Sequence, residues 1–165
     1  MVQVLSRGKE MNVEEIFQPK TSVNRISKLN PKLRESALWV YNECIREKIP
    51  LHIVCTTRSI QEQQTIYKYG RTIPGKVLTT NRPGYSAHNY GLALDFCLVY
   101  DGGMKTWEDA TKDDIWKWRW LKVLKRFEEQ GWESGWRWSY NWEPGHVQNL
   151  LGHTLGQLYT KHQHD

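Results

Sequence analysis

The chain has 165 residues, the length of one domain, which leaves little room for a second. Charged residues make up 25% of it, but 9 Trp and 8 Tyr supply large side chains for a core, which excludes a long disordered chain. The sequence has no run of about 18 apolar residues, which excludes a transmembrane helix. The net charge of +5 suits an anionic partner, yet the basic residues are scattered and no nucleic-acid recognition motif accompanies them.

The first thirty residues are interpreted as a polar lead-in. Residues 1–20 alternate charges with isolated hydrophobic residues and lack the apolar centre of a secretory signal. We therefore expect a protein that is kept in the cytoplasm of the producing cell until another factor releases it. The three cysteines, Cys44, Cys55 and Cys97, are widely spaced and form no CxxC pair, which predicts buried, reduced thiols.

The first helix is predicted to begin at Pro31, with Asn30 as its cap, because apolar residues then recur at helical spacing to about Lys48. Pro50 ends this helix. The β-branched segment 51–57 that follows predicts a strand.

A second helix is predicted from a capping box, in which Ser59 precedes Glu62 by three positions, and it runs to about Tyr69. Residues 71–87 contain Pro and Gly without periodicity, so they predict a long loop of the kind that usually carries function. The apolar segment 91–100 predicts a buried strand.

In the second half of the sequence, the apolar pattern predicts a helix at 112–130, with Trp116 and Trp120 in the core. A short strand and an aromatic loop are expected at 132–142, then a strand around Val147 and a helix at 150–159. These elements predict an α+β fold: one compact domain in which helices flank a small antiparallel sheet. We expect this domain to span residues 31–160, followed by a tail at 161–165.

His88 and Asp95 stand out because they lie seven positions apart around a glycine. On a continuous strand their side chains would point to opposite faces, and on a helix they would lie about 10 Å apart along the axis. They can share one metal ion only if the backbone bends, and Gly91 lies where the bend is required. The alternative is a surface histidine and an aspartate paired with an arginine.

A second pair, Glu143 and His146, is separated by a Pro-Gly turn. Zinc hydrolases use such a pair with histidine on the metal and glutamate as general base, although a polar turn without chemistry is the alternative. Together, His88, Asp95 and His146 would make three ligands with an open fourth position, which is the pattern of catalytic zinc.

These residues resemble a known family. The motif S-x-H-x-x-G-x-A-x-D at 86–95, followed by E-x-x-H at 143–146, looks like the signature of the zinc peptidases that cut bacterial cell-wall peptides. These include D-Ala-D-Ala carboxypeptidases and dipeptidases and the L-alanyl-D-glutamate endopeptidases of phage lysis proteins. The segment T-R-S-I-Q-E-Q at 57–63, with G-R-T at 70–72, resembles the endopeptidase branch, and the likeness spans about residues 22–148.

The resemblance implies a role for each matching position. The zinc ligands would be His88, Asp95 and His146, and the zinc site would lie at the sheet. The general base would be Glu143, and Arg58 would stabilise the developing oxyanion or bind a substrate carboxylate. The expected substrate contacts are Ser86, Arg58, Gln63 and Trp142.

The implied function is a zinc peptidase that hydrolyses the stem peptide of peptidoglycan at the L-Ala-D-Glu bond, as a phage endolysin does. We expect one catalytic Zn²⁺, a monomer, and neither nucleic-acid binding nor membrane insertion. The alternatives are a D-Ala-D-Ala carboxypeptidase or dipeptidase of the same fold, and a non-catalytic zinc-containing module that binds the wall. Two features depart from the endopeptidase pattern: the residue before His146 is glycine rather than proline, and the segment 131–142 is unusually rich in Trp.

Overall fold

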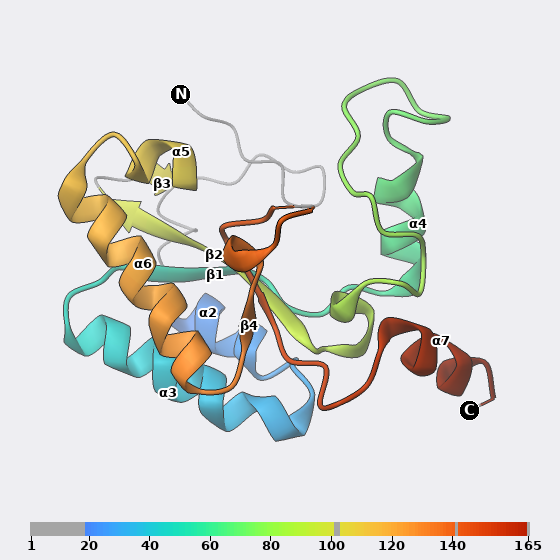
Figure 1. Ribbon diagram of the computed structural model, residues 1–165, viewed down its shortest axis with the longest axis horizontal. Coiled ribbons are helices and arrows are strands. Elements are labelled where there is room, and N and C mark those ends of the chain that lie inside the picture. Colours follow the sequence, from blue (N-terminus) through green and yellow to red (C-terminus); the bar gives the residue numbers. More distant parts are fainter. Residues whose placement is uncertain (1–18, 101–102, 141, 165) are drawn as a thin grey trace.

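The computed structural model describes residues 19–100, 103–140 and 142–164 (Figure 1). Its helices are α2 (Pro19–Ile26), α3 (Pro31–Arg46), α4 (Ile60–Lys68), α5 (Trp107–Ala110), α6 (Asp114–Glu129) and α7 (Leu155–His164), with short 3-10 helices η1 (Ala87–Tyr90) and η2 (Gly135–Arg137). Its strands are β1 (Leu51–Cys55), β2 (Ala93–Tyr100), β3 (Gly103–Lys105), β4 (Glu133–Ser134) and β5 (His146–Gln148). Within these residues, every helix is too short or too polar to cross a membrane.

The strands form one antiparallel sheet in the order β1-β2-β5-β4, and β3 pairs with the far end of β2. Alternate residues of β2 face opposite sides, so Leu94, Phe96 and Leu98 enter the main core while Asp95 lies on the other face. Phe96 packs against Trp120 and Phe127 of α6. The predicted α+β fold is confirmed.

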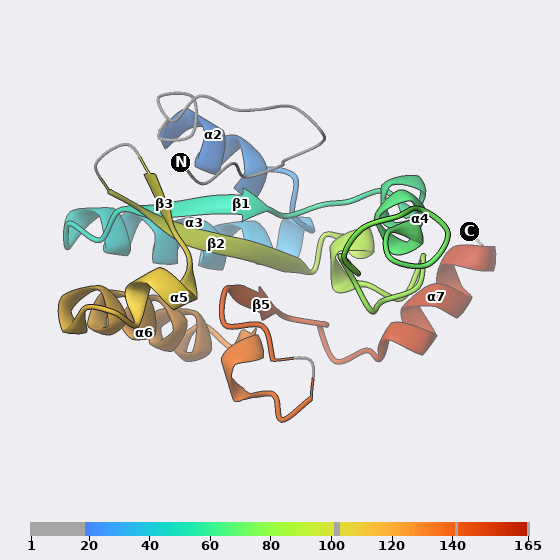
Figure 2. The ribbon, with the colours of Figure 1, turned by 90° about the horizontal axis from the view of Figure 1, so that it is seen from above.

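The helices α4 and α7 lie together at one end of the molecule, away from α3 and α6 (Figures 1 and 2). Helix α2 lies beside β1, on the opposite side of the sheet from α6 in Figure 2. The long loop that follows α4 belongs to the same end as α7. The predicted functional loop therefore lies beside the sheet rather than over its main core.

The predicted capping signals are confirmed at two helix starts, and a third helix has a cap that was not predicted. Asn30 accepts a hydrogen bond from Lys32 N at 3.1 Å, and Ser59 and Glu62 form the reciprocal capping box of α4. Asp113 caps α6 through two backbone N–H groups. The last helix, in contrast, begins at Leu155 rather than at residue 150, because residues 151 and 152 adopt positive φ and interrupt the chain.

The expected lead-in contributes to the core, so the expected start of the domain at residue 31 does not match the packing. Ser22, Ile26 and Leu29 are buried. The Ser22 hydroxyl accepts the N–H of Ile53 at 3.1 Å, so α2 is attached to β1 by hydrogen bonds that its polar sequence did not suggest. Residues 1–18 lie outside the described residues. At the other end, residues 161–164 continue α7 instead of forming a tail, and residue 165 also lies outside.

All three cysteines are free thiols, as expected. Cys44 and Cys97 are buried, and burial raises the pKa of each thiol to about 12. The prediction of a buried thiol is wrong for Cys55, which is half-buried. It ends β1 next to a register shift, and its side chain lies beside His88 at the edge of the sheet.

Candidate active site

The site is built on one row of residues across the sheet. Asp95 of β2 pairs with Cys55 of β1 on one side and with His146 of β5 on the other. Residues directly opposite each other in an antiparallel sheet project to the same face. The register therefore places His146 Nδ1 2.9 Å from Asp95 Oδ1, although the two residues are 51 positions apart in sequence.

His88 reaches the same carboxylate from η1. This short helix ends at Gly91, whose φ of 66° and ψ of 28° are left-handed, and the chain then enters β2. The bend brings His88 Nε2 to 3.3 Å from Asp95 Oδ2. The backbone bend predicted at Gly91 is confirmed.

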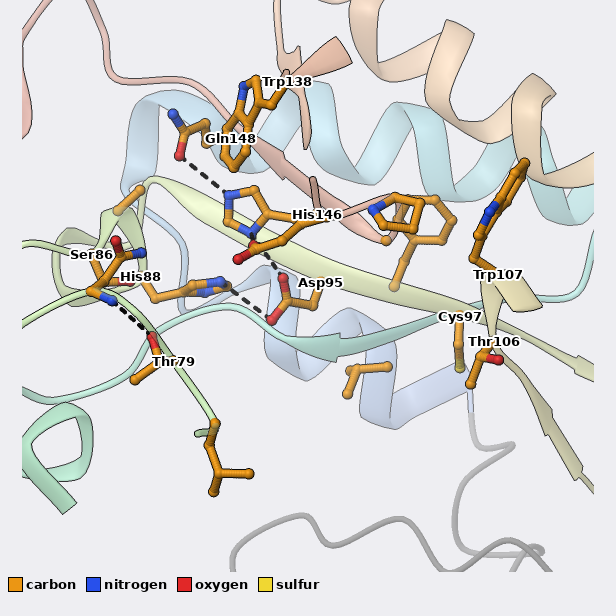
Figure 3. A pocket seen from close by; sticks show the side chains of 18 of the residues that line it. Thr79, Ser86, His88, Asp95, Cys97, Thr106, Trp107, Trp138, His146 and Gln148 are labelled. Atoms are coloured by element: carbon orange, nitrogen blue, oxygen red, sulfur yellow. Dashed lines mark hydrogen bonds and ion pairs between the residues drawn. The ribbon is translucent and has the colours of Figure 1, made fainter. Parts of the chain in front are cut away.

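Both imidazoles are oriented by a hydrogen bond on the ring nitrogen that points away from Asp95; Figure 3 shows the one between His146 and Gln148. His88 Nδ1 lies 2.6 Å from the Thr56 carbonyl oxygen, so this nitrogen donates a proton to it. His146 Nε2 lies 3.2 Å from Gln148 Oε1 and donates in the same way. The other nitrogen of each ring therefore faces the Asp95 carboxylate, where it can carry a proton or, without that proton, bind a metal ion.

The electrostatics of the row favour a positive charge between the rings. Burial tends to lower the pKa of His88, but the Asp95 carboxylate outweighs burial and raises this pKa to about 10. Burial tends to raise the pKa of Asp95, but His88 and His146 hold it well below its usual value. A proton or a metal ion can supply that charge.

The donor set also fits zinc. Two imidazole nitrogens and one carboxylate are typical ligands, and metal–ligand distances near 2 Å leave ligand atoms about 3 to 3.5 Å apart. The separations from Asp95 oxygens to His88 Nε2, 3.3 Å, and to His146 Nδ1, 2.9 Å, match this spacing. The ligand roles stay predictions, and the structure brings the three predicted residues together.

Another triple, Cys55, His88 and Asp95, places one ligand atom of each residue within 4.8 Å of the other two. Cys55 Sγ, however, lies 3.9 Å from His88 Nδ1, the nitrogen that already donates to the backbone, and 3.7 Å from an Arg58 nitrogen. The other ring nitrogen of His88, Nε2, faces Asp95 instead. We therefore favour His146 over Cys55 as the third ligand.

Glu143 lies next to the row, with its side chain 47% exposed and one carboxylate oxygen 3.6 Å from His146 Nδ1. Trp120 stabilises the turn that carries Glu143, because its indole N–H donates to the Pro144 carbonyl at 2.8 Å. Gly145 accepts a hydrogen bond from Phe96 N, and a Cβ on Gly145 would lie 2.9 Å from the Phe96 carbonyl oxygen. Glycine before His146 thus allows the turn to approach β2 closely.

Arg58 follows β1 and lines the cleft, and Gln63 lies behind it. Arg58 Nη1 donates to Gln63 Oε1 at 2.9 Å, and Gln63 Nε2 donates to the Asn81 carbonyl at 2.8 Å. Gln63 is fully buried, so its predicted contact with substrate is corrected: it joins Arg58 to the loop after α4. Asn89 supports the same region because its amide donates to the Arg58 carbonyl at 3.0 Å.

The cleft around the row has a volume of about 630 Å³. Thr79 and Ser86 lie on the His88 side and Trp107 on the other, and Trp138 lies over His146 (Figure 3). Ser86 lines the cleft, and its side chain makes no capping hydrogen bond to η1. Trp142 is absent from the cleft lining, and its predicted substrate contact is not supported because its ring packs against Trp107 and Trp136.

Sequence reasoning missed Gln148 and Glu133. Gln148 is two positions after His146 on a strand, so strand periodicity already places both on one face. Glu133 has no comparable local signal, because it reaches the site through the pairing of β4 with β5.

Comparisons with known proteins place the chain in a family. Residues 26–149, which contain every predicted site residue, match the family described as VanY, D-alanyl-D-alanine carboxypeptidase. The chain is 35% identical over 115 residues to the peptidoglycan L-alanyl-D-glutamate endopeptidase CwlK of Bacillus subtilis strain 168, and the aligned part covers 68% of each protein.

Two solved structures share the fold. The L-Ala D-Glu endopeptidase ChiX of Serratia marcescens has a TM-score of 0.53 at 20% identity, covering 82% of this chain and 91% of ChiX. The LD-carboxypeptidase LdcB has a TM-score of 0.54 at 19% identity, covering 81% of this chain and 69% of LdcB. The resemblance noted from the motifs is confirmed: the chain belongs to the VanY D-alanyl-D-alanine carboxypeptidase family of peptidoglycan-hydrolysing peptidases.

Proposed function

We propose that the protein is a zinc-dependent endopeptidase that hydrolyses the L-Ala-D-Glu bond of the peptidoglycan stem peptide. One observation carries the proposal: two imidazoles, each committed to an outer acceptor, aim their remaining nitrogens at one carboxylate, and the open carboxylate of Glu143 lies beside them. The relationship to CwlK supports the choice of bond, because that protein's name states this specificity.

The residues that would hold the ion are His88 through Nε2, Asp95 through its carboxylate and His146 through Nδ1. Zinc supplies a Lewis acid that polarises the scissile carbonyl and makes water more acidic. Three protein ligands leave room for substrate, which is the arrangement of catalytic rather than structural zinc sites.

The chain's own groups then move the proton and hold the substrate. Glu143 accepts a proton from the attacking water and passes it to the leaving amine. Its half-exposed carboxylate can reach both, because it lies at the mouth of the cleft. Arg58 presents a planar fork, oriented by Gln63, to the developing oxyanion or to the D-Glu carboxylate, and Ser86 offers a hydroxyl on the same side.

The biological role that we propose is that of a phage endolysin, supported by the resemblance to the endopeptidases of phage lysis proteins. The protein would wait in the cytoplasm of the producing cell and act as a monomer on the wall after release. The net charge of +5 suits an anionic wall surface.

The competing specificity is that of a D-Ala-D-Ala carboxypeptidase, which the family description favours. The two activities leave different products, so mass spectrometry of digested peptidoglycan separates them. Cleavage at L-Ala-D-Glu creates new N-terminal D-Glu, whereas a carboxypeptidase releases free D-Ala.

The test compares the wild type with Glu143→Ala, and bound zinc is quantified in both. We expect the wild type to release N-terminal D-Glu and Glu143→Ala to hold zinc but cut nothing. Glu129→Ala, at an exposed site on α6, is the matched control and retains activity. Free D-Ala in place of new D-Glu ends would contradict the proposed bond, and full activity of Glu143→Ala would contradict the role of this carboxylate.

A further inference from the structure

We infer that Glu133 is a positioning residue, which sets the orientation of the Gln148 amide and thereby the proton position on His146. This inference rests on the proposed function, because it concerns a ligand of the proposed metal site. Glu133 itself lies outside the row of ligand residues and outside the cleft lining.

The contacts form an unbroken chain from Glu133 to the site. The β4–β5 register pairs Glu133 with Gln148, and His146 follows on the same face of β5, two positions away. Gln148 Nε2 donates to Glu133 Oε2 at 3.3 Å, and His146 Nε2 lies 3.2 Å from Gln148 Oε1.

The direction of these hydrogen bonds is set by the carboxylate. A glutamine side chain can present either its oxygen or its NH₂ group to a neighbour, whereas a carboxylate only accepts. The NH₂ group of Gln148 must therefore face Glu133, which leaves the oxygen to face His146. That oxygen accepts only from a protonated Nε2, so in the neutral ring the lone pair that can bind a metal ion is on Nδ1 of His146.

The opposite orientation of the Gln148 amide would prevent His146 from binding the metal ion through Nδ1. An NH₂ group facing His146 would need an unprotonated Nε2, and the ring proton would then lie on Nδ1, between the ring and Asp95. His88 does not depend on such a chain, because its outer acceptor is the Thr56 backbone carbonyl, which cannot rotate. Of the two imidazoles, only His146 has a side chain as its outer acceptor.

The second oxygen of Glu133 is also committed. Oε1 accepts the indole N–H of Trp138, whose ring lies 5.3 Å from that of His146 and lines the cleft. One carboxylate thus holds both the amide behind His146 and the aromatic ring over it. Because Glu133 is exposed, a substitution there leaves the hydrophobic core unchanged.

The experiment measures zinc affinity by competition of metal-free protein with a chromogenic chelator. Glu133→Gln is expected to weaken zinc binding about tenfold or more, because an amide at this position accepts as well as donates and no longer orients Gln148. The exchanged pair Glu133→Gln/Gln148→Glu is expected to recover most of the affinity. In that variant a carboxylate at position 148 accepts from His146, and the amide at position 133 donates to it, at unchanged net charge.

The matched control is Glu128→Gln, which removes the neighbouring carboxylate that binds Arg137 and should leave zinc affinity unchanged. Thermal unfolding of each metal-free variant reports whether it is folded. Equal zinc affinity in the wild type and Glu133→Gln would overturn the inference, as would a folded exchanged pair that binds as weakly as the single variant. Failure of the wild type to bind zinc would instead overturn the proposed metal site, and the inference with it.

Discussion

Replacement of Gly91 by alanine tests whether the bend between His88 and Asp95 is a backbone requirement. Gly91 has a φ of 66°, which costs a residue with a side chain about 1 to 2 kcal/mol. A Cβ at this position would also lie 2.9 Å from the backbone nitrogen of Asn30, closer than real Cβ contacts come.

The backbone cannot move away freely, because Asn30 N donates to the Gly91 carbonyl at 2.9 Å and a hydrogen bond of this kind contributes about 1 kcal/mol. We therefore expect Gly91→Ala to lower the free energy of unfolding by about 2 to 3 kcal/mol. In a chain of this length that corresponds to a fall in Tm of about 5 to 10 °C. The same shift would move His88 relative to Asp95 and weaken zinc binding.

The matched control is Gly152→Ala. Gly152 has a φ of 81°, but a Cβ there would have no heavy atom within 4 Å, so only the conformational cost applies. Urea unfolding and zinc titration of both variants measure the difference. If Gly91→Ala is no more destabilising than Gly152→Ala, or binds zinc as the wild type does, the close approach to Asn30 does not control the bend.

Three further predictions concern His52, Arg58 and Trp120. Burial, assisted by Arg25, lowers the pKa of His52 from 6.5 to about 4, so His52 is neutral in the folded protein at pH 7. The free energy of unfolding should therefore fall by up to about 3 kcal/mol as the pH falls from 6.5 towards 4. Urea unfolding at pH 7 and pH 4.5 checks this, and the loss should be smaller in His52→Asn; an equal loss would show that other groups cause it. Arg58→Lys should reduce kcat/KM about 100-fold at unchanged zinc affinity, because an ammonium replaces the planar fork; steady-state kinetics measure it, and a fall of only a few fold would contradict the role. Trp120→Phe removes the indole N–H from the Pro144 carbonyl and should cost about 1 to 3 kcal/mol in unfolding free energy and lower kcat by moving Glu143; a variant with wild-type kcat would show that the turn holds without this bond.

The two imidazoles of the site are oriented by different means. His88 depends on a backbone carbonyl, and His146 depends on a side-chain amide that Glu133 orients. The first arrangement follows from the fold and tolerates changes of side chain. The second arrangement can be disrupted by a single substitution at Glu133 or Gln148. Substitutions on the His146 side are therefore expected to change the metal affinity of this chain most easily.

The sequence by itself determined the features that depend on neighbouring residues. The capping box of Ser59 and Glu62, the Asn30 cap and the bend at Gly91 are interactions within a few positions, so local residue types are sufficient to predict them. The motifs around His88 and His146 indicated the site residues for the same reason, since their spacing is short within each motif.

Only the tertiary structure decided how distant segments meet. The pairing of β2 with both β1 and β5 brings Asp95 to His146 across 51 positions, and the pairing of β4 with β5 adds Glu133. The burial of α2 and the half-exposure of Cys55 likewise depend on contacts with β1 and on the edge of the sheet. Strand register is a property of two chain segments together, and no single segment contains it, which is why these features had to be seen in the fold.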